Sequence, residues 1–83
     1  SANVRRKAER SNSDHIGAQM PGTIFSVEVK EGQEVSQGDV LIIAEAMKME
    51  TTIQAPKAGV IKAIHVEVGD AISVGDLLIE YEN

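Results

Sequence analysis

The sequence has no cysteine and only two aromatic residues, Phe25 and Tyr81. Without cysteine there can be no disulfide, and the two histidines are too few for a structural zinc site of the usual kind. The scarcity of aromatic side chains also argues against a flat aromatic binding platform. With 83 residues, the chain has room for one small domain, which must be stabilised by closure and regular packing.

Arginine is missing after Arg10, and residues 17–83 carry four lysines against eleven carboxylates. This acidic balance differs from the basic surfaces of nucleic-acid-binding modules. No apolar run approaches the roughly 20 residues of a membrane span, and the sequence shows no apolar stretch of a signal peptide. We therefore expect a cytoplasmic domain that has neither nucleic acid nor a membrane as its partner.

The chain is rich in residues that favour β-structure, since valine, isoleucine and leucine number 9, 9 and 3. From His15 onward, apolar and polar residues alternate between glycine-containing turns, a pattern typical of short strands. Residues 1–14 are polar and charged, and they cannot supply an apolar face to a core. We therefore expect a flexible linker over residues 1–14 and a β-domain over residues 15–83.

The second half of the chain repeats the first at a constant offset of 37 residues without a gap. Conservative pairs lie between the identical ones. Alone, each copy would expose an apolar face and strand edges, whereas two copies packed together can close. The identical pairs include Gly22 and Gly59, Ile24 and Ile61, Val29 and Val66, Gly32 and Gly69, Ser36 and Ser73, Gly38 and Gly75, Asp39 and Asp76, Leu41 and Leu78, Ile42 and Ile79, and Glu45 and Glu82.

The repeat predicts an all-β fold class, a flattened β-barrel or sandwich of two small antiparallel sheets with quasi-two-fold symmetry. Each copy should contain a strand, a glycine turn, a short strand, a Gly-Asp turn and a further strand. At the Gly-Asp turns, glycine allows a positive φ at little cost. The expected strands are residues 23–29, 40–43, 60–66 and 77–79, with further short strands at residues 18–20 and 51–54.

The repeat does not explain the run between the copies, Glu45-Ala46-Met47-Lys48-Met49-Glu50. This run joins two apolar strands, so we expect a tight hairpin at one end of the domain, with both chain termini near the opposite end. Lys48 should lie at its tip and project into water. The two methionines beside it are adaptable contacts for a partner, or they pack partly over the end of the barrel.

The run Ala46-Met47-Lys48-Met49, with Glu45 before it and Glu50 after it, resembles the biotin attachment motif of biotinyl (biotin carboxyl carrier) domains. Residues 17–82 resemble the whole of that domain, and the constant offset leaves no room for the thumb insertion of some carriers. Within this family, three segments look most like the C-terminal end of bacterial pyruvate carboxylases. They are His15-Ile16-Gly17-Ala18, Met20-Pro21-Gly22 and residues 49–56.

The resemblance implies that a biotin protein ligase attaches biotin, the one cofactor we expect, to Lys48. Ala46, Met47 and Met49 are then the recognition motif, flanked by Glu45 and Glu50. By itself the domain would be a non-catalytic carrier, joined by its linker to the upstream domains of a biotin-dependent carboxylase. It would carry carboxyl groups from a biotin carboxylase site to a carboxyltransferase site, in the conversion of pyruvate to oxaloacetate. No catalytic residue and no metal site are expected in the domain.

Three alternatives stay open. The parent can be another biotin-dependent carboxylase or a decarboxylase. A lipoyl domain has a related pattern, although its modified lysine typically lies in an Asp-Lys-Ala context. A structural hairpin of the membrane-fusion type predicts no modification, and its usual coiled-coil segments are missing here.

Few other residues suggest chemistry. His65 should point to solvent, and His15 should help to fix where the linker meets the domain. The run Ser13-Asp14-His15 has the residue types of a catalytic triad, but neighbours in sequence cannot normally adopt triad geometry. The acidic residues around Asp70 lack the spacing of a calcium loop, and we interpret them as turn residues.

Overall fold

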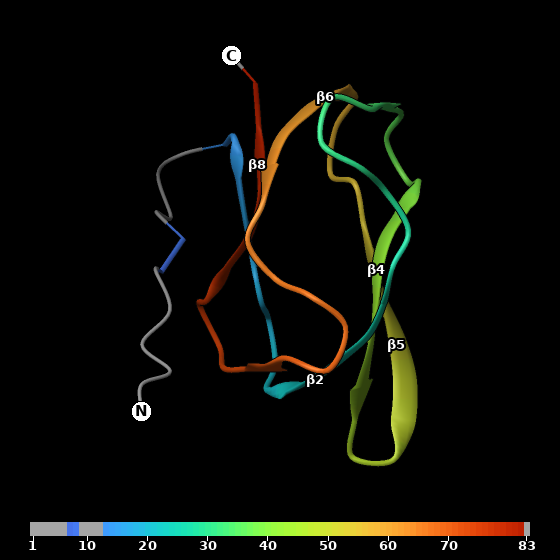
Figure 1. The fold of residues 1–83 in the computed structure, drawn as a ribbon, viewed down its shortest axis with the longest axis vertical. Helices are drawn as coiled ribbons and strands as arrows, with labels where there is room; N and C mark the ends of the chain where they lie inside the picture. The colour runs from blue at the N-terminus through green and yellow to red at the C-terminus, as the bar shows by residue number, and fades with distance from the viewer. Residues whose placement is uncertain (1–6, 9–12, 83) are drawn as a thin grey trace.

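The computed structural model describes residues 7–8 and 13–82, which form eight strands and no helix. Two four-stranded antiparallel sheets result, with the strand orders β1-β8-β6-β3 and β5-β4-β2-β7 (Figure 1). The all-β fold predicted from the sequence is therefore confirmed. Since the described part contains no helix, it also contains none that could cross a membrane. The strands are β1 (His15–Gly17), β2 (Gly22–Val27), β3 (Glu34–Val35), β4 (Val40–Ala46), β5 (Met49–Gln54), β6 (Gly59–Ile64), β7 (Ala71–Ile72) and β8 (Leu77–Tyr81).

The two sheets are related by the predicted quasi-two-fold symmetry. Exchanging β1 with β5, β2 with β6, β3 with β7 and β4 with β8 converts one strand order into the other. The hydrogen bonds repeat in the same way: Gly32 N donates to Ile61 O at 2.7 Å, and Gly69 N donates to Ile24 O at 2.8 Å. Each copy thus closes its first turn onto a strand of the other copy, so that each half supplies backbone partners to the other.

The Gly-Asp turns have the backbone conformation that the sequence predicted. Gly38 and Gly75 have φ angles of 90° and 89°, a region in which a Cβ atom would be strained. The aspartate after each glycine closes the turn, because Asp39 Oδ2 accepts from Ser36 N at 2.9 Å. In the second copy Asp76 Oδ2 accepts from Ser73 N at 2.8 Å. These turns direct the chain into β4 and β8, each of which is one of the two central strands of its sheet.

The core lies between the sheets and consists mainly of aliphatic side chains from both copies. Burying each large aliphatic side chain contributes about 1.5–3 kcal/mol relative to leaving it in water. Tyr81 is the one aromatic member, because Phe25 lies at a β-bulge in β2 and is 55% exposed. The largest fully buried side chains are Ile24, Leu41, Ile42, Ile61, Leu77, Leu78, Ile79 and Tyr81.

One predicted strand is wrong. Residues 18–20 form no strand, and the first strand is β1, three residues earlier. Its ladder with β8 ends at the pair Gly17 and Leu77. Beyond it, Ala18 bonds to the second Gly-Asp turn instead, donating to Asp76 O at 2.9 Å and accepting from Gly75 N at 2.8 Å. The backbone groups of Ala18 are thus used by the turn and not by a sheet.

The predicted linker lies mostly outside the described residues, since only Lys7, Ala8, Ser13 and Asp14 of residues 1–14 are described. Ala8 N donates to Gly75 O at 2.8 Å, so this part of the segment contacts the β-domain. Asp14 O accepts from Tyr81 N at 2.8 Å, which brings the start of β1 beside the end of β8. That end of β8 is opposite the β4–β5 turn in Figure 1, as expected for the C-terminus.

Candidate functional site

The unmatched run between the copies forms the predicted hairpin. Strands β4 and β5 pair in register, with Glu45 opposite Glu50 and Ala46 opposite Met49. Only Met47 and Lys48 remain to connect them, so the loop has two residues. Lys48 therefore lies in the β4–β5 turn, which is at one end of the long axis of the domain (Figure 1).

Both loop residues have a left-handed backbone, with φ 52° at Met47 and 65° at Lys48. Two positive φ angles define a type I′ turn, whose twist matches that of the flanking strands and which usually contains Asn-Gly. For residues with a Cβ atom, the left-handed conformation costs about 1–2 kcal/mol each. Neither position of this turn holds asparagine or glycine, the residues that would reduce this cost. Strain of this kind is typical of functional sites.

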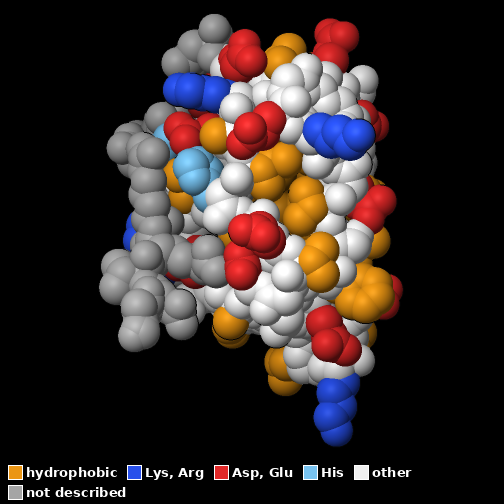
Figure 2. Space-filling view, in the orientation of Figure 1, with side chains coloured by type: hydrophobic (Ala, Val, Ile, Leu, Met, Phe, Trp, Pro, Cys, Tyr) orange, Lys and Arg blue, Asp and Glu red, His pale blue; other side chains and the backbone are white. Residues whose placement is uncertain are grey.

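The side chains at the tip lie in water. Met47 is 94% exposed and Met49 is 70% exposed, so neither packs over the end of the barrel, the second role that the sequence had left open. Lys48 is exposed as well. Figure 2 shows a cationic side chain projecting beyond this end of the molecule. The tip therefore exposes two large apolar side chains on either side of an amine.

The charged side chains near the amine do not favour the stability of the hairpin. Glu45 and Glu50 are both exposed and lie directly opposite each other on β4 and β5, an arrangement of like charges that destabilises a strand pair. Within the described ranges, neither carboxylate lies at ion-pair distance from the Lys48 amine. The hairpin thus presents an exposed amine with two exposed carboxylates behind it.

Ala46 has a different position from its neighbours in the motif. It is half-buried, and a Cβ atom on Gly22 would lie only 3.3 Å from the Ala46 Cβ. The same Cβ would lie 2.6 Å from Glu45 O. Strand β2 therefore passes so close to the base of the hairpin that a small residue is needed on both strands. This gives Ala46 a packing role in the structure.

A groove of about 470 Å³ lies beside the hairpin. Its walls come from the hairpin strands and from the connection between β1 and β2. It has both polar and apolar surface and begins at Ala46, two residues from Lys48. Its lining includes Met20, Pro21, Ala44, Ala46, Thr51 and Ile53.

The other candidates from the sequence have structural roles. His15 and His65 lie on either side of Glu80, at 3.3 and 2.8 Å from its carboxylate oxygens. The His15 side chain is 3% exposed, consistent with a role in placing the first strand. Asp14, immediately before the same strand, pairs with Lys57 at 2.6 Å. Among residues 7–8 and 13–82, no three histidine or carboxylate side chains are arranged to hold a metal ion.

Tyr81, to which the sequence pattern assigned no role, makes a buried polar contact. Its hydroxyl donates to Lys57 O at 2.9 Å, and the Lys57 amine lies 5.0 Å from the ring centroid. Burial raises the pKa of Tyr81 above its ordinary value, although the hydrogen bond and the lysine charge act in the opposite direction. This site lies at the far end of the domain from Lys48, so it concerns stability.

Residues 14–81 match the family model described as biotin-requiring enzyme, which includes both biotin and lipoyl carriers. The chain belongs to the biotin/lipoyl carrier-domain family. The match begins at Asp14 and ends at Tyr81, the residues that bond to each other where β1 meets β8. The whole β-domain is therefore covered by the match, and it constitutes the carrier domain of this chain.

Relatives identify the type of carrier domain. Pyruvate carboxylases of Staphylococcus aureus and Bacillus subtilis are 59% and 54% identical over 59 residues, which are 71% of this chain and 5% of each relative. The crystal structure of the complete pyruvate carboxylase from Rhizobium etli has a TM-score of 0.81 and 49% identity, covering 95% of this chain and 7% of that one. The carrier domain is thus related to the biotinyl domains of biotin-dependent carboxylases, and it spans a small part of the relatives' length.

The fold is shared with lipoyl carriers. The lipoyl domain of the 2-oxoglutarate dehydrogenase complex from Azotobacter vinelandii has a TM-score of 0.72 and 25% identity, covering 83% of this chain and 95% of that domain. Because that chain is a lipoyl domain alone, the similarity confirms the biotinyl/lipoyl-domain fold that the repeat and the motif predicted.

Proposed function

We propose that Lys48 is the biotin attachment site, and that the carrier domain uses it to transfer carboxyl groups between two catalytic sites. The observation that carries this proposal is the position of Lys48 in a two-residue left-handed turn, exposed between two exposed methionines. A ligase can enclose such a turn from all sides, because only the strands β4 and β5 connect it to the domain. The relatives that name pyruvate carboxylase support the same role.

Attachment forms one amide bond. The Lys48 amine attacks the acyl carbon of biotinyl-adenylate, AMP leaves with the electron pair of the broken bond, and a base of the ligase accepts the proton from the amine. Met47 and Met49 provide the apolar contacts that hold the turn in the ligase. The product has one positive charge fewer at the tip.

The attached biotin gives the carrier domain an arm of roughly 15 Å, from about a dozen bonds of ordinary length. A biotin carboxylase site loads the arm with a carboxyl group, and a carboxyltransferase site unloads it onto the acceptor. We take pyruvate as the acceptor, because the similarity to pyruvate carboxylases extends over 59 residues at 54–59% identity. Where the two sites are farther apart than the arm can reach, the domain travels on the linker of residues 1–14.

Purified ligases test the type of carrier. We expect biotin protein ligase with biotin and ATP to add one biotinyl group to the chain, while lipoate ligase adds nothing. The variant Lys48→Arg keeps the charge but should accept no biotin, whereas Lys62→Arg, which changes an exposed lysine on β6, should react like the unchanged chain. Lipoylation without biotinylation would assign the chain to the lipoyl carriers instead.

The carrier step has its own test. We expect a biotin carboxylase subunit with ATP and labelled bicarbonate to transfer label to the biotinylated chain, and a carboxyltransferase with pyruvate to remove it as oxaloacetate. The unbiotinylated chain is the control and should stay unlabelled. If another acceptor removes the label and pyruvate does not, the chain belongs to a different biotin-dependent enzyme. The carrier role would still hold.

A further inference from the structure

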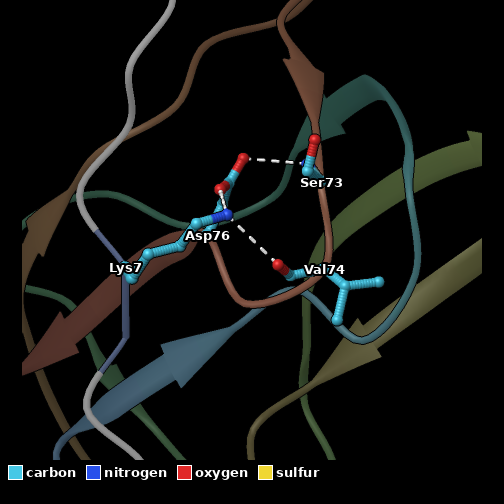
Figure 3. Close-up of polar contacts among 4 residues, drawn as sticks. All are labelled: Lys7, Ser73, Val74 and Asp76. Carbon is cyan, nitrogen blue, oxygen red and sulfur yellow. Dashed lines mark hydrogen bonds and ion pairs between the residues drawn. The ribbon is translucent and has the colours of Figure 1, made fainter.

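Asp76 is the one Asp, Glu, Lys or Arg residue that is buried among the described residues, with an exposure of 4%. Its Oδ1 lies 2.5 Å from the amine of Lys7, which is 69 positions away in the sequence. The same amine donates to Val74 O at 3.2 Å, and next to it Ala8 N donates to Gly75 O at 2.8 Å. Figure 3 shows Lys7 reaching into the turn from outside, toward the carboxylate and the carbonyl together.

The internal repeat supplies a comparison within the molecule. Asp39 is the counterpart of Asp76 and closes its own turn in the same way, with Oδ2 accepting from Ser36 N. Asp39 is exposed, however, and among the described residues no lysine contacts it. Closing the turn therefore requires neither burial of the aspartate nor a cation. What distinguishes the second turn is the added segment of Lys7 and Ala8.

The domain surface accommodates this segment closely. Ala8 Cβ lies 2.9 Å from the point where a Cβ on Gly17 would be, and Lys7 Cδ lies 3.7 Å from the corresponding point on Gly75. The glycine at position 17 thus leaves the space that Ala8 fills. A side chain at position 17 would push the segment off the domain.

We propose that the turn of residues 73–76 is a docking site for Lys7 and Ala8, and that docking sets the point at which the linker leaves the carrier domain. Docking would then control how far from the linker Lys48 can reach. This inference rests on the proposed function, because reach matters only if Lys48 carries biotin between two sites. In the docked state the linker leaves at Lys7, beside Asp76. In the released state it leaves at Asp14, beside Tyr81.

The two exits are far apart along the domain. Residues 77–81 of β8 separate Asp76 from Tyr81, which is about 17 Å of extended strand. Figure 1 shows the end of β8 and the β4–β5 turn at opposite ends of the long axis, which measures 31 Å. Release therefore moves the pivot away from the hairpin and adds up to about 25 Å of chain between residues 7 and 14. Both changes enlarge the volume that Lys48 can reach.

The contact is suited to reversible release. The Lys7 side chain is 59% exposed, so water competes for its charge, and ion pairs of this exposure are weak. Two backbone groups and one small side chain complete the contact, with no large apolar side chain buried. Segments held in this way open locally without global unfolding.

Amide hydrogen exchange of Ala8 in the unbiotinylated 83-residue chain tests docking directly, because this amide donates to Gly75 O only in the docked state. We expect Ala8 to exchange about tenfold more slowly than its intrinsic rate, which corresponds to about 1.4 kcal/mol for the weak ion pair and the backbone hydrogen bonds together. Lys7→Met should remove this protection, while Lys62→Met should retain it. An Ala8 amide that exchanges at its intrinsic rate in the unchanged chain would overturn the proposal.

The repeat offers a second, matched pair of variants. Asp76→Asn keeps an oxygen for Ser73 N but loses the charge that faces Lys7, and Asp39→Asn makes the same change in the other turn. We expect Asp76→Asn to lower the protection of the Ala8 amide and Asp39→Asn to leave it unchanged. The amide signals of β8 should show that both variants are folded. Equal protection in all three chains would exclude docking through Asp76. Because no biotin is involved, failure here is distinct from failure of the carrier assignment.

Discussion

At the tip of the hairpin, Met47 occupies a left-handed backbone position without burying its side chain. Its φ is 52° and its exposure 94%, so it contributes strain and almost no packing. Backbone strain of this kind clusters at functional sites. Met47 is therefore the residue at which stability and ligase recognition should be separable.

We expect Met47→Asn to stabilise the carrier domain by about 0.5–1 kcal/mol, because asparagine adopts the left-handed conformation at less cost. The free energy of unfolding in urea measures this. The same variant should lower kcat/KM of biotin protein ligase, since the apolar contact is lost. A variant that is less stable than the unchanged chain would show that Met47 packs on the domain after all.

Tyr81 gives a residue-scale test that depends on pH. Its folded-state pKa is raised by burial, so the folded domain holds the phenolic proton at a pH where the unfolded chain has lost it. The stabilisation is then complete below pH 10, the ordinary pKa, and decreases as the pH rises toward the folded pKa. We expect the melting temperature to fall above about pH 10.

The control for this effect is Tyr81→Phe, which should be less stable at pH 8 through loss of the hydrogen bond to Lys57 O but should lose less stability between pH 8 and 11. Because Tyr81 is the only tyrosine, absorbance at high pH follows its ionisation directly. Equal pH dependence in both chains would show that other groups, lysines above all, determine it.

At the scale of elements, the close approach of β2 to the hairpin positions Lys48. We expect Gly22→Ala to destabilise the domain by about 2–3 kcal/mol, because its Cβ would lie 2.6 Å from Glu45 O, a backbone atom that cannot rotate away. Thr23→Ala, at an exposed position on the same strand, should lower the free energy of unfolding by only about 0.5 kcal/mol. A Gly22→Ala chain that unfolds at the same urea concentration as the unchanged chain would contradict this close packing of β2 on the hairpin.

The strands, the sheets and the site hairpin could be predicted because duplication makes the same evidence appear twice. Gly38 and Gly75 each support the other as turn glycines, and the run around Lys48 was recognisable because it lacks a counterpart. The repeat also accounts for the first strand, which was expected at residues 18–20. Strand β5 ends at Gln54, and the counterpart of Gln54 in the first copy is Gly17, where β1 ends.

Two features could not be predicted from the sequence pattern. The left-handed turn at Met47 and Lys48 contains neither asparagine nor glycine, the residues by which such turns are recognised. Docking of Lys7 on Asp76 uses one charge and backbone hydrogen bonds, which leave no periodic signal in residues 1–14. Its only trace in the sequence is indirect, in the glycine at position 17.

At the scale of the whole molecule, the two ends of the domain differ: one carries the Lys48 hairpin, and at the other the start of β1 meets the end of β8. Residues 17–83 have a strongly acidic balance, so the catalytic sites that receive the domain should be basic around their entrances. Attraction of this kind accelerates encounter while leaving the complex weak, which suits a carrier that must leave again.

We expect the rate of carboxylation of the biotinylated domain by a biotin carboxylase subunit to fall several-fold between about 50 and 300 mM salt, as screening shortens the range of the attraction. Replacing both Glu45 and Glu50 by glutamine should reduce this salt dependence, whereas Glu82→Gln, an exposed change at the other end, should not. A rate that is independent of salt would exclude charge-guided docking.

The central claim is that one amine, at the left-handed turn joining the two halves, is where biotin is attached. Peptide mapping by mass spectrometry after co-expression with biotin protein ligase measures this most directly. We expect a biotinyl group on the peptide that contains Lys48, and unmodified Lys7, Lys30, Lys57 and Lys62 in the same sample. A Lys48 peptide that stays unmodified in the presence of active ligase would contradict the claim.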